Sequence, residues 1–233
     1  MQNNVKFVTD GSKVYRLGGN DWYAVEQDDD KIMLVDTDCE IVNERLKSPW
    51  SDGYYCSEEG ENGQCILNHC NNLVDTYFST IKYAIEPRTV EAGTGKLEDA
   101  YMWPMSKEEF DSNKVVSKKI AENSCGVVWT RTFGVNCGNY RYAWYVNDVG
   151  GDLSGSNVRR LCRVAPAFYL RKSAIDHITE DGEIILKPEE QKGKFATGES
   201  KVYHLAGNDW YAVMEDNDKV MLVDTDGEIN GIE

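Results

Sequence analysis

The chain has 233 residues, of which 41% are hydrophobic and 28% charged, a composition typical of a globular protein with a core. Its net charge of −15 leaves no broad basic face for nucleic acid. No apolar run reaches the roughly 18 residues of a membrane helix, and residues 1–11 show no signal-peptide pattern. We therefore expect neither a nucleic-acid partner nor membrane insertion.

An internal repeat opens the chain and returns near its end. Lys13–Ile41 recurs as Lys201–Ile229 with identical residues at 22 of 29 positions. The first copy predicts strands at 14–17, 22–25 and 32–35, joined by a Gly-Asn-Asp turn and an acidic turn. Such a three-stranded meander is marginally stable alone.

The position of the repeat bears on domain organisation. Residues 189–200 are polar and contain glycine, as linkers do. We favour one domain over residues 1–188, then this linker, then residues 201–233 as the start of a second, truncated module. The alternative is that the second copy packs on the same body as the first.

Metal sites are poorly supported. The acidic turn Asp28–Asp30 lacks the calcium-loop pattern of an EF-hand. Seven cysteines include no C-x-x-C pair, and Cys65, His69 and Cys70 form only a weak zinc pattern. Cys56 could form a disulfide with Cys65 or Cys70 in an exported protein. We expect no metal and no cofactor.

Helices are predicted only in the middle of the chain. Apolar residues recur at helical spacing over Asn71–Ile85, and Pro87 ends the pattern. A capping box of Ser106 and Glu109 starts another helix, and residues 115–120 extend it or form a third. Strands follow at 127–130, 142–146 and 167–170. This order indicates an α+β fold.

Residues 126–166 differ in composition from the rest of the chain. They contain no Lys, Glu, Gln, Met, His or Ile, although Lys and Glu are common elsewhere. Five arginines and two aspartates give this segment a charge of +3. Arg and Tyr are enriched at binding hot spots, while Ser, Gly and Asn supply adaptable contacts. We therefore place a binding face here.

Several segments resemble one family. GVVWTRTFGVN, YAWYVNDVGGDLSGSNV and RVAPAFYL are similar to the closing half of bacterial and phage domains with a C-type-lectin-like fold, which are related to the formylglycine-generating enzymes. The matching elements are Trp129–Thr132, Ala143–Gly150 and Val164–Ala167, together with the hairpin Trp22–Asp38 and the segment Tyr101–Phe110. The resemblance implies antiparallel sheets, two main helices and long C-terminal loops.

Within that family the chain resembles the variable proteins of diversity-generating retroelements, whose adenine-directed mutagenesis of AAY codons cannot produce Lys, Glu, Gln, Met or Trp. The resemblance implies a scaffold that includes Trp129, Trp144 and Pro166. It also implies diversified contact residues, which we take to be Phe133, Val135, Cys137, Gly138, Tyr140, Arg141, Tyr142, Ser154, Ser156, Arg159, Arg160, Leu161 and Cys162.

The resemblance implies a non-catalytic, receptor-binding or adhesin-like domain. Its partner would be a macromolecule, with protein favoured, and its location a virion or bacterial cell surface. One alternative is a non-diversified structural domain of a phage tail or surface protein. Another is a copper-dependent thiol oxidase of the formylglycine-generating type, with Cys137 and Cys162 as its redox pair.

Overall fold

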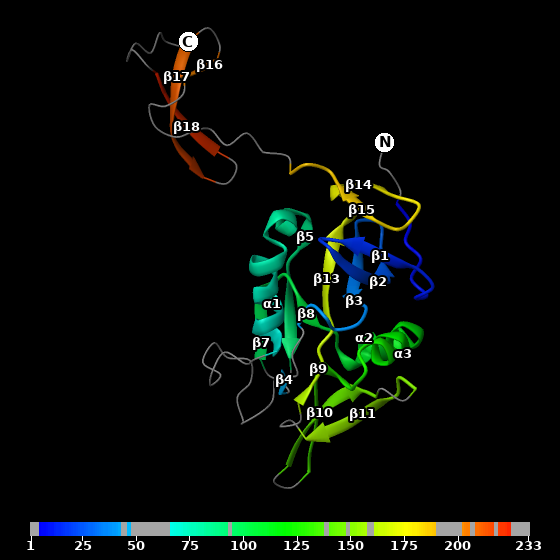
Figure 1. The fold of residues 1–233 in the computed structure, drawn as a ribbon. Helices are drawn as coiled ribbons and strands as arrows, with labels where there is room; N and C mark the ends of the chain where they lie inside the picture. The colour runs from blue at the N-terminus through cyan, green and yellow to red at the C-terminus, as the bar shows by residue number, and fades with distance from the viewer. Residues whose placement is uncertain are drawn as a thin grey trace. The chain divides into compact units, whose positions relative to one another are not determined.

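The structure is a computed structural model that describes residues 5–42, 46–47, 66–92, 95–137, 140–147, 150–157, 161–189, 202–205, 208–216 and 219–224. The chain divides into two compact units, Met1–Lys187 and Pro188–Glu233. The first is a mixed α+β unit with mostly antiparallel sheets and few helices (Figure 1). The expected linker is almost entirely outside the described residues.

The first repeat copy forms one edge of the main sheet. Its three predicted strands are confirmed as β1 (Val14–Leu17), β2 (Asn20–Gln27) and β3 (Lys31–Asp36). The sheet continues from β3 to β13 (Pro166–Arg171) and β5 (Ile85–Glu86), and β8 (Trp103–Pro104) also pairs with β13. Strands far apart in sequence are thus joined through β13.

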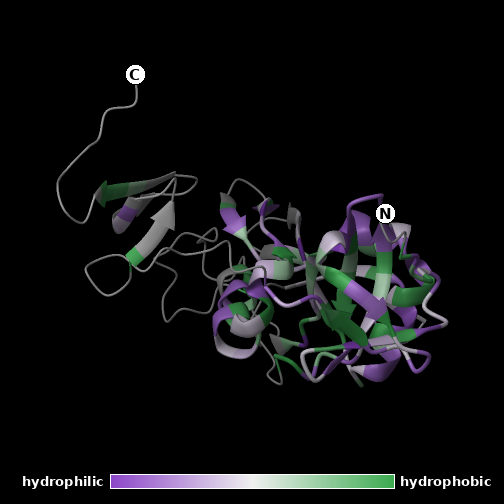
Figure 2. Ribbon diagram, turned by 90° about the horizontal axis from the view of Figure 1, so that it is seen from above, coloured by the Kyte–Doolittle hydropathy of each residue, from purple (hydrophilic) through white to green (hydrophobic). Residues whose placement is uncertain are grey.

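The core lies against this sheet. The Trp22 ring packs edge-on against Phe168 and Phe78, with ring centroids 4.8 and 5.7 Å apart. Phe168 comes from β13 and Phe78 from the segment after the first helix, so one buried ring contacts two other parts of the chain. Figure 2 shows hydrophobic positions concentrated along the strands of the main sheet.

The first predicted helix is shorter and begins earlier than expected. Helix α1 spans Ile66–Tyr77, and a 3-10 helix, η3, follows over Ser79–Ala84. The break is at Phe78, whose backbone leaves the helical region while its side chain is buried against Trp22. Tyr77 is one of the apolar residues in the helical pattern over Asn71–Ile85, which we expected to be buried, but its side chain is exposed. Tertiary packing of Phe78 therefore overrides the helical periodicity.

The capping box is confirmed, and it starts α2 (Lys107–Ser112). A third helix, α3 (Lys114–Asn123), follows and buries Val116 and Ile120, whereas Val115 is exposed. Both α2 and α3 contact the strand β10 described next. No helix among the described residues is long and apolar enough to span a membrane.

A second sheet contains most of residues 126–166, the segment with the distinct composition. It contains β9 (Val128–Cys137), β10 (Tyr140–Val146) and β11 (Leu153–Asn157) in the order β11-β10-β9. The predicted strand at 142–146 is part of β10, and the predicted strand at 127–130 overlaps β9, which begins one residue later and continues to Cys137. We refer to this three-stranded sheet as the binding sheet.

Short strand pairs complete the first unit. They are β12 (Leu161–Cys162) with β4 (Leu46–Lys47), β6 (Arg88–Ala92) with β7 (Gly95–Ala100), and β14 (Ile175–Ile178) with β15 (Ile184–Leu186). A 3-10 turn, η4 (Lys172–Ala174), follows β13.

The second unit contains the second repeat copy as a three-stranded antiparallel sheet. Its strands are β16 (Val202–Leu205), β17 (Asn208–Asp216) and β18 (Lys219–Asp224). They occupy the same repeat positions as β1, β2 and β3.

Candidate binding face

The binding sheet brings together most of the predicted contact positions. Eight of the thirteen positions lie on its strands. They are Phe133, Val135 and Cys137 on β9, Tyr140, Arg141 and Tyr142 on β10, and Ser154 and Ser156 on β11. Gly138, Arg159 and Arg160 are outside the described residues. Leu161 and Cys162 lie apart, on β12.

The register divides these positions between two faces. Ser154 is opposite Tyr145, and Ser156 is opposite Ala143. Because strand residues alternate between faces, Tyr142 projects from the opposite face to Ser154 and Ser156. All three are half-buried. The thirteen positions therefore do not form one continuous surface on the sheet.

Cys162 requires a correction. We expected it to contact a ligand, but it is only 1% exposed, on the short strand β12 that pairs with β4. A side chain so buried cannot contact a partner at the surface. Cysteine is commonly a small buried residue in protein cores, and that is its role here.

The positive charge of residues 126–166 also requires a correction. Arg131, counted in that charge, is only 8% exposed. Its guanidinium forms a bidentate ion pair with Glu109, with one Nη–Oε1 distance of 2.8 Å. Its charge is neutralised within the fold, so it adds nothing to an exposed basic surface.

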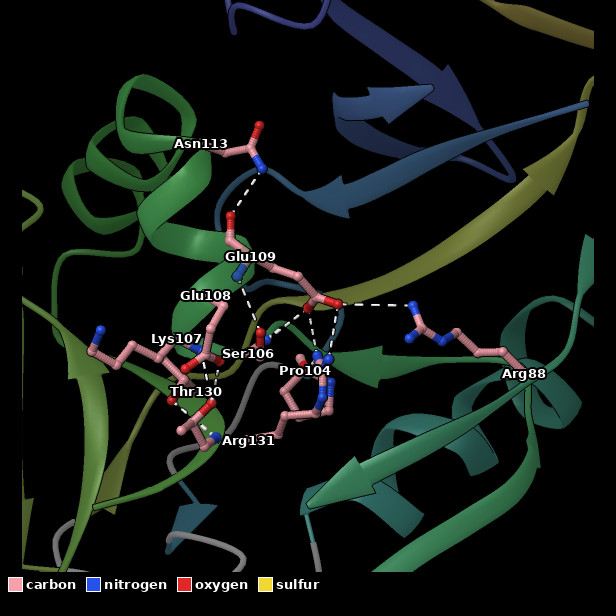
Figure 3. Close-up of polar contacts among 10 residues, drawn as sticks. Arg88, Pro104, Ser106, Lys107, Glu108, Glu109, Asn113, Thr130 and Arg131 are labelled. Carbon is pink, nitrogen blue, oxygen red and sulfur yellow. Dashed lines mark hydrogen bonds and ion pairs between the residues drawn. The ribbon is translucent and has the colours of Figure 1, made fainter. Parts of the chain in front are cut away.

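The Arg131–Glu109 pair fixes the start of β9 (Figure 3). Glu109 also completes the capping box, because its Oε2 accepts a 2.7 Å hydrogen bond from the Ser106 backbone N–H. The Arg131 guanidinium donates to the Pro104 carbonyl at 3.0 Å, and the Arg131 backbone N–H donates to the Met105 carbonyl at 3.0 Å. One carboxylate thus ties a helix N-terminus to a strand of the binding sheet.

Arg88 extends this set of contacts toward the main sheet. Its guanidinium lies 3.8 Å from Glu109 Oε1, and it stacks over the rings of Trp103 and Tyr169 at 5.2 and 5.5 Å. We call Arg88, Ser106, Glu109 and Arg131 the anchor. The anchor connects β6, the α2 N-terminus and β9, with aromatic contacts to β8 and β13.

Neighbouring hydroxyl contacts support the anchor. Thr132 accepts a 2.8 Å hydrogen bond from the Lys107 backbone N–H and donates to Glu108 at 3.2 Å. The Lys107 ammonium lies 5.1 Å from the centre of the Trp144 ring on β10. The sequence indicated the Ser106–Glu109 and Trp129–Thr132 segments separately but not the ion pair between Glu109 and Arg131. The opposite charges of these two residues were the only signal for that pair.

Two glycines set the backbone geometry beside and within the binding sheet. A Cβ at Gly134 would lie 2.8 Å from the Tyr142 carbonyl oxygen, so β9 and β10 approach closely there. Gly151 has a φ of +75°, and a Cβ there would lie 2.6 Å from Lys118 Cα. The loop before β11 is thereby held against α3.

A shallow hollow of about 270 Å³ lies where this loop meets the helices. Charged residues of both signs and apolar residues line it. Its lining consists of Phe110, Asp111, Lys114, Val115, Lys118, Gly150, Gly151, Asp152 and Leu153. The hollow therefore borders the binding sheet at the β11 side.

Two buried cysteines in the described part of the chain have shifted pKa values. Burial raises the pKa of the Cys39 and Cys70 thiols well above the usual range, which disfavours their thiolates. Among the described residues, no three His, Cys, Asp or Glu side chains form a group that could hold a metal ion. Cys56 and Cys65 of the zinc and disulfide alternatives lie outside those residues, as does the Cys137 side chain of the proposed redox pair.

Comparison of the chain with protein-family models, with curated proteins and with solved structures found no match in any of the three.

Proposed function

We propose that residues 1–188 form a C-type-lectin-like domain that binds a macromolecular ligand, with protein favoured, without catalysing a reaction. The binding sheet and the loops beyond it would contact the partner. One observation carries the proposal: eight predicted contact positions share one small sheet whose first strand is held by the buried Arg131–Glu109 pair. Separation of a rigid support from variable contacts is typical of binding proteins.

The composition of residues 126–166 supports diversification of the contact positions. Lys, Glu, Gln and Met, which mutagenesis of adenines in AAY codons cannot produce, are missing there, and Trp, which it also cannot produce, occurs only at Trp129 and Trp144, two of the predicted scaffold positions. Of the predicted scaffold residues, Trp129 and Pro166 are buried, which fits positions that stay constant, and Trp144 is half-buried. The domain would then act as a receptor-binding or adhesin-like module on a virion or cell surface.

The DNA beside the gene tests diversification. We expect a near-copy of the codons for Val127–Pro166, differing only at adenines, next to a reverse-transcriptase gene. A locus with neither element would contradict diversification and leave a non-diversified binding domain.

Binding itself is tested by replacing Tyr140, Arg141 and Arg160 together with alanine. We expect loss of the partner that the parent protein captures from host-cell surface extracts, with a melting temperature within about 2 °C of the parent, since surface substitutions change stability little. An unfolded triple variant would mean that these residues belong to the core, and the proposal would fail.

A further inference from the structure

The two repeat copies adopt matching strand registers. Trp22 is opposite Asp36 in the first copy, and Trp210 is opposite Asp224 in the second. Each copy has a β-bulge at the same place, after Ala24 and after Ala212. The second copy is therefore the same three-stranded unit as the first.

The copies differ in how their third strands are covered. In the first copy β13 pairs with β3 over five positions, and Met33 and Val35 are 0% exposed. The equivalent residues Met221 and Val223 are 52% and 46% exposed. Within the described residues, β18 is paired on one side only, with β17. Identical side chains are thus buried in one copy and uncovered in the other.

The described side chain on the outer strand of the meander shows no such difference. Val14 and its equivalent Val202, on the far edge of each sheet, are 38% and 37% exposed. The second copy therefore has an ordinary outer edge and an incomplete inner edge. Unpaired apolar edges are sites where another strand adds.

The first copy indicates what such a strand would be. Apolar residues of β13 cover β3, and the basic residue Lys172 follows directly. Lys172 donates to the Asp28 carbonyl at 2.5 Å and to Gln27 Oε1 at 3.1 Å. Glu215 stands at the position of Gln27 in the second copy. The net negative charge of residues 188–233 favours a cation at the end of the incoming strand.

A second copy of this chain is a poor source of the strand. Phe168 and Leu170 of β13 are fully buried in the first unit, so β13 cannot be donated without unfolding that unit. Residues 188–233 carry eleven acidic and four basic side chains, so pairing two of these units brings like charges together.

The second meander also does not fit the place that β1, β2 and β3 occupy in the main sheet. Gly18 has a φ of +61°, and a Cβ there would lie 2.9 Å from the Phe78 ring. Ala206 stands at the equivalent position. The second meander would therefore strain the turn against Phe78 if it took the place of β1–β3.

We propose that β18 is a docking edge for an antiparallel, apolar strand with a basic C-terminal end, donated by another polypeptide. The strand would pair with β18 as β13 pairs with β3, covering Met221 and Val223. This inference concerns the second unit and does not depend on the function proposed for the binding sheet.

The test uses the full chain and a fluorescent peptide of the sequence VAPAFYLRKS, residues 164–173, measured by fluorescence anisotropy. We expect saturable binding at one site. A scrambled peptide of the same composition controls for attraction by charge alone. The peptide with Arg171→Glu and Lys172→Glu should bind at least about tenfold more weakly, because its C-terminal end would face acidic residues.

Matched variants locate the site. Met221→Lys with Val223→Lys should weaken peptide binding at least about tenfold, since lysines block strand addition at an edge. Val202→Lys, on the outer edge, should leave binding unchanged. Far-ultraviolet circular dichroism checks that each variant keeps its strands.

Three results would overturn the proposal. They are absence of saturable peptide binding, equal binding of the scrambled peptide, and equal binding by the Met221→Lys, Val223→Lys variant. Analytical ultracentrifugation adds a fourth. A concentration-dependent dimer of the parent that this variant abolishes would assign the edge to a second copy of the chain instead.

Discussion

At the residue scale, Asp36 is a buried carboxyl at the end of β3 with an unusual ionisation. Burial in the core, reinforced by the neighbouring Asp38, raises the pKa of Asp36 to about 8. The folded state therefore holds a proton that the unfolded chain releases near pH 4. Stability from this group is present below that pH and is lost as the pH rises toward 8, at up to about 1.4 kcal/mol per pH unit.

Asp36→Asn removes this titration. We expect the stability of the variant relative to the parent to increase between pH 5 and pH 8, measured as melting temperature at each pH. Asp29→Asn is the control, because Asp29 is exposed and the second repeat copy has asparagine there. A difference between Asp36→Asn and the parent that stays constant with pH would contradict the assignment.

Gly134 is the second residue with a specific prediction. Gly134→Ala should destabilise the first unit by about 1–3 kcal/mol, because its Cβ would collide with the Tyr142 backbone. Gly155→Ala, on β11 of the same sheet, meets nothing within 4 Å and should be neutral or slightly stabilising. Urea denaturation compares the two, and equal effects would mean that β9 and β10 do not approach closely at Gly134.

At the element scale, the anchor joins a helix start to the binding sheet. Arg131→Met leaves the Glu109 carboxylate largely buried without its main partner, which should cost about 3–5 kcal/mol. Adding Glu109→Gln should recover part of this loss, since glutamine keeps the capping box and carries no charge. Urea denaturation measures both variants.

Lys82→Met is the matched control, because Lys82 pairs with Asp75 on the surface. Its loss should cost no more than about 1 kcal/mol. If Arg131→Met cost as little, β9 would not depend on the anchor for its stability.

Local signals predicted the elements better than their ends. The meander strands and the Ser106 capping box follow from turn residues and alternation near in sequence. The end of α1 could not be predicted from nearby residues, because Phe78 leaves the helix to pack on Trp22, 56 positions away in the chain. Cys162 is likewise buried on a strand, β12, whose pairing with β4 no local pattern indicates.

At the scale of the whole molecule, the sequence predicted an α+β chain with a repeated meander but not the partners of its charges. Arg131 was counted as part of a basic surface, and the fold pairs it with Glu109, 22 positions earlier. The repeat copies make the same point. Met33 and Met221 stand in nearly the same local sequence, and the surrounding fold decides that one is buried and the other exposed.

The central claim is that contact positions in residues 126–166 vary freely on a fixed support. A substitution scan of this segment, read as the amount of folded protein displayed on yeast, tests it most directly. We predict tolerance at Phe133, Val135, Tyr140 and Arg141, and loss of folded protein at Trp129, Arg131 and Ala143. Equal intolerance in both sets would contradict the claim and make the binding sheet part of the core.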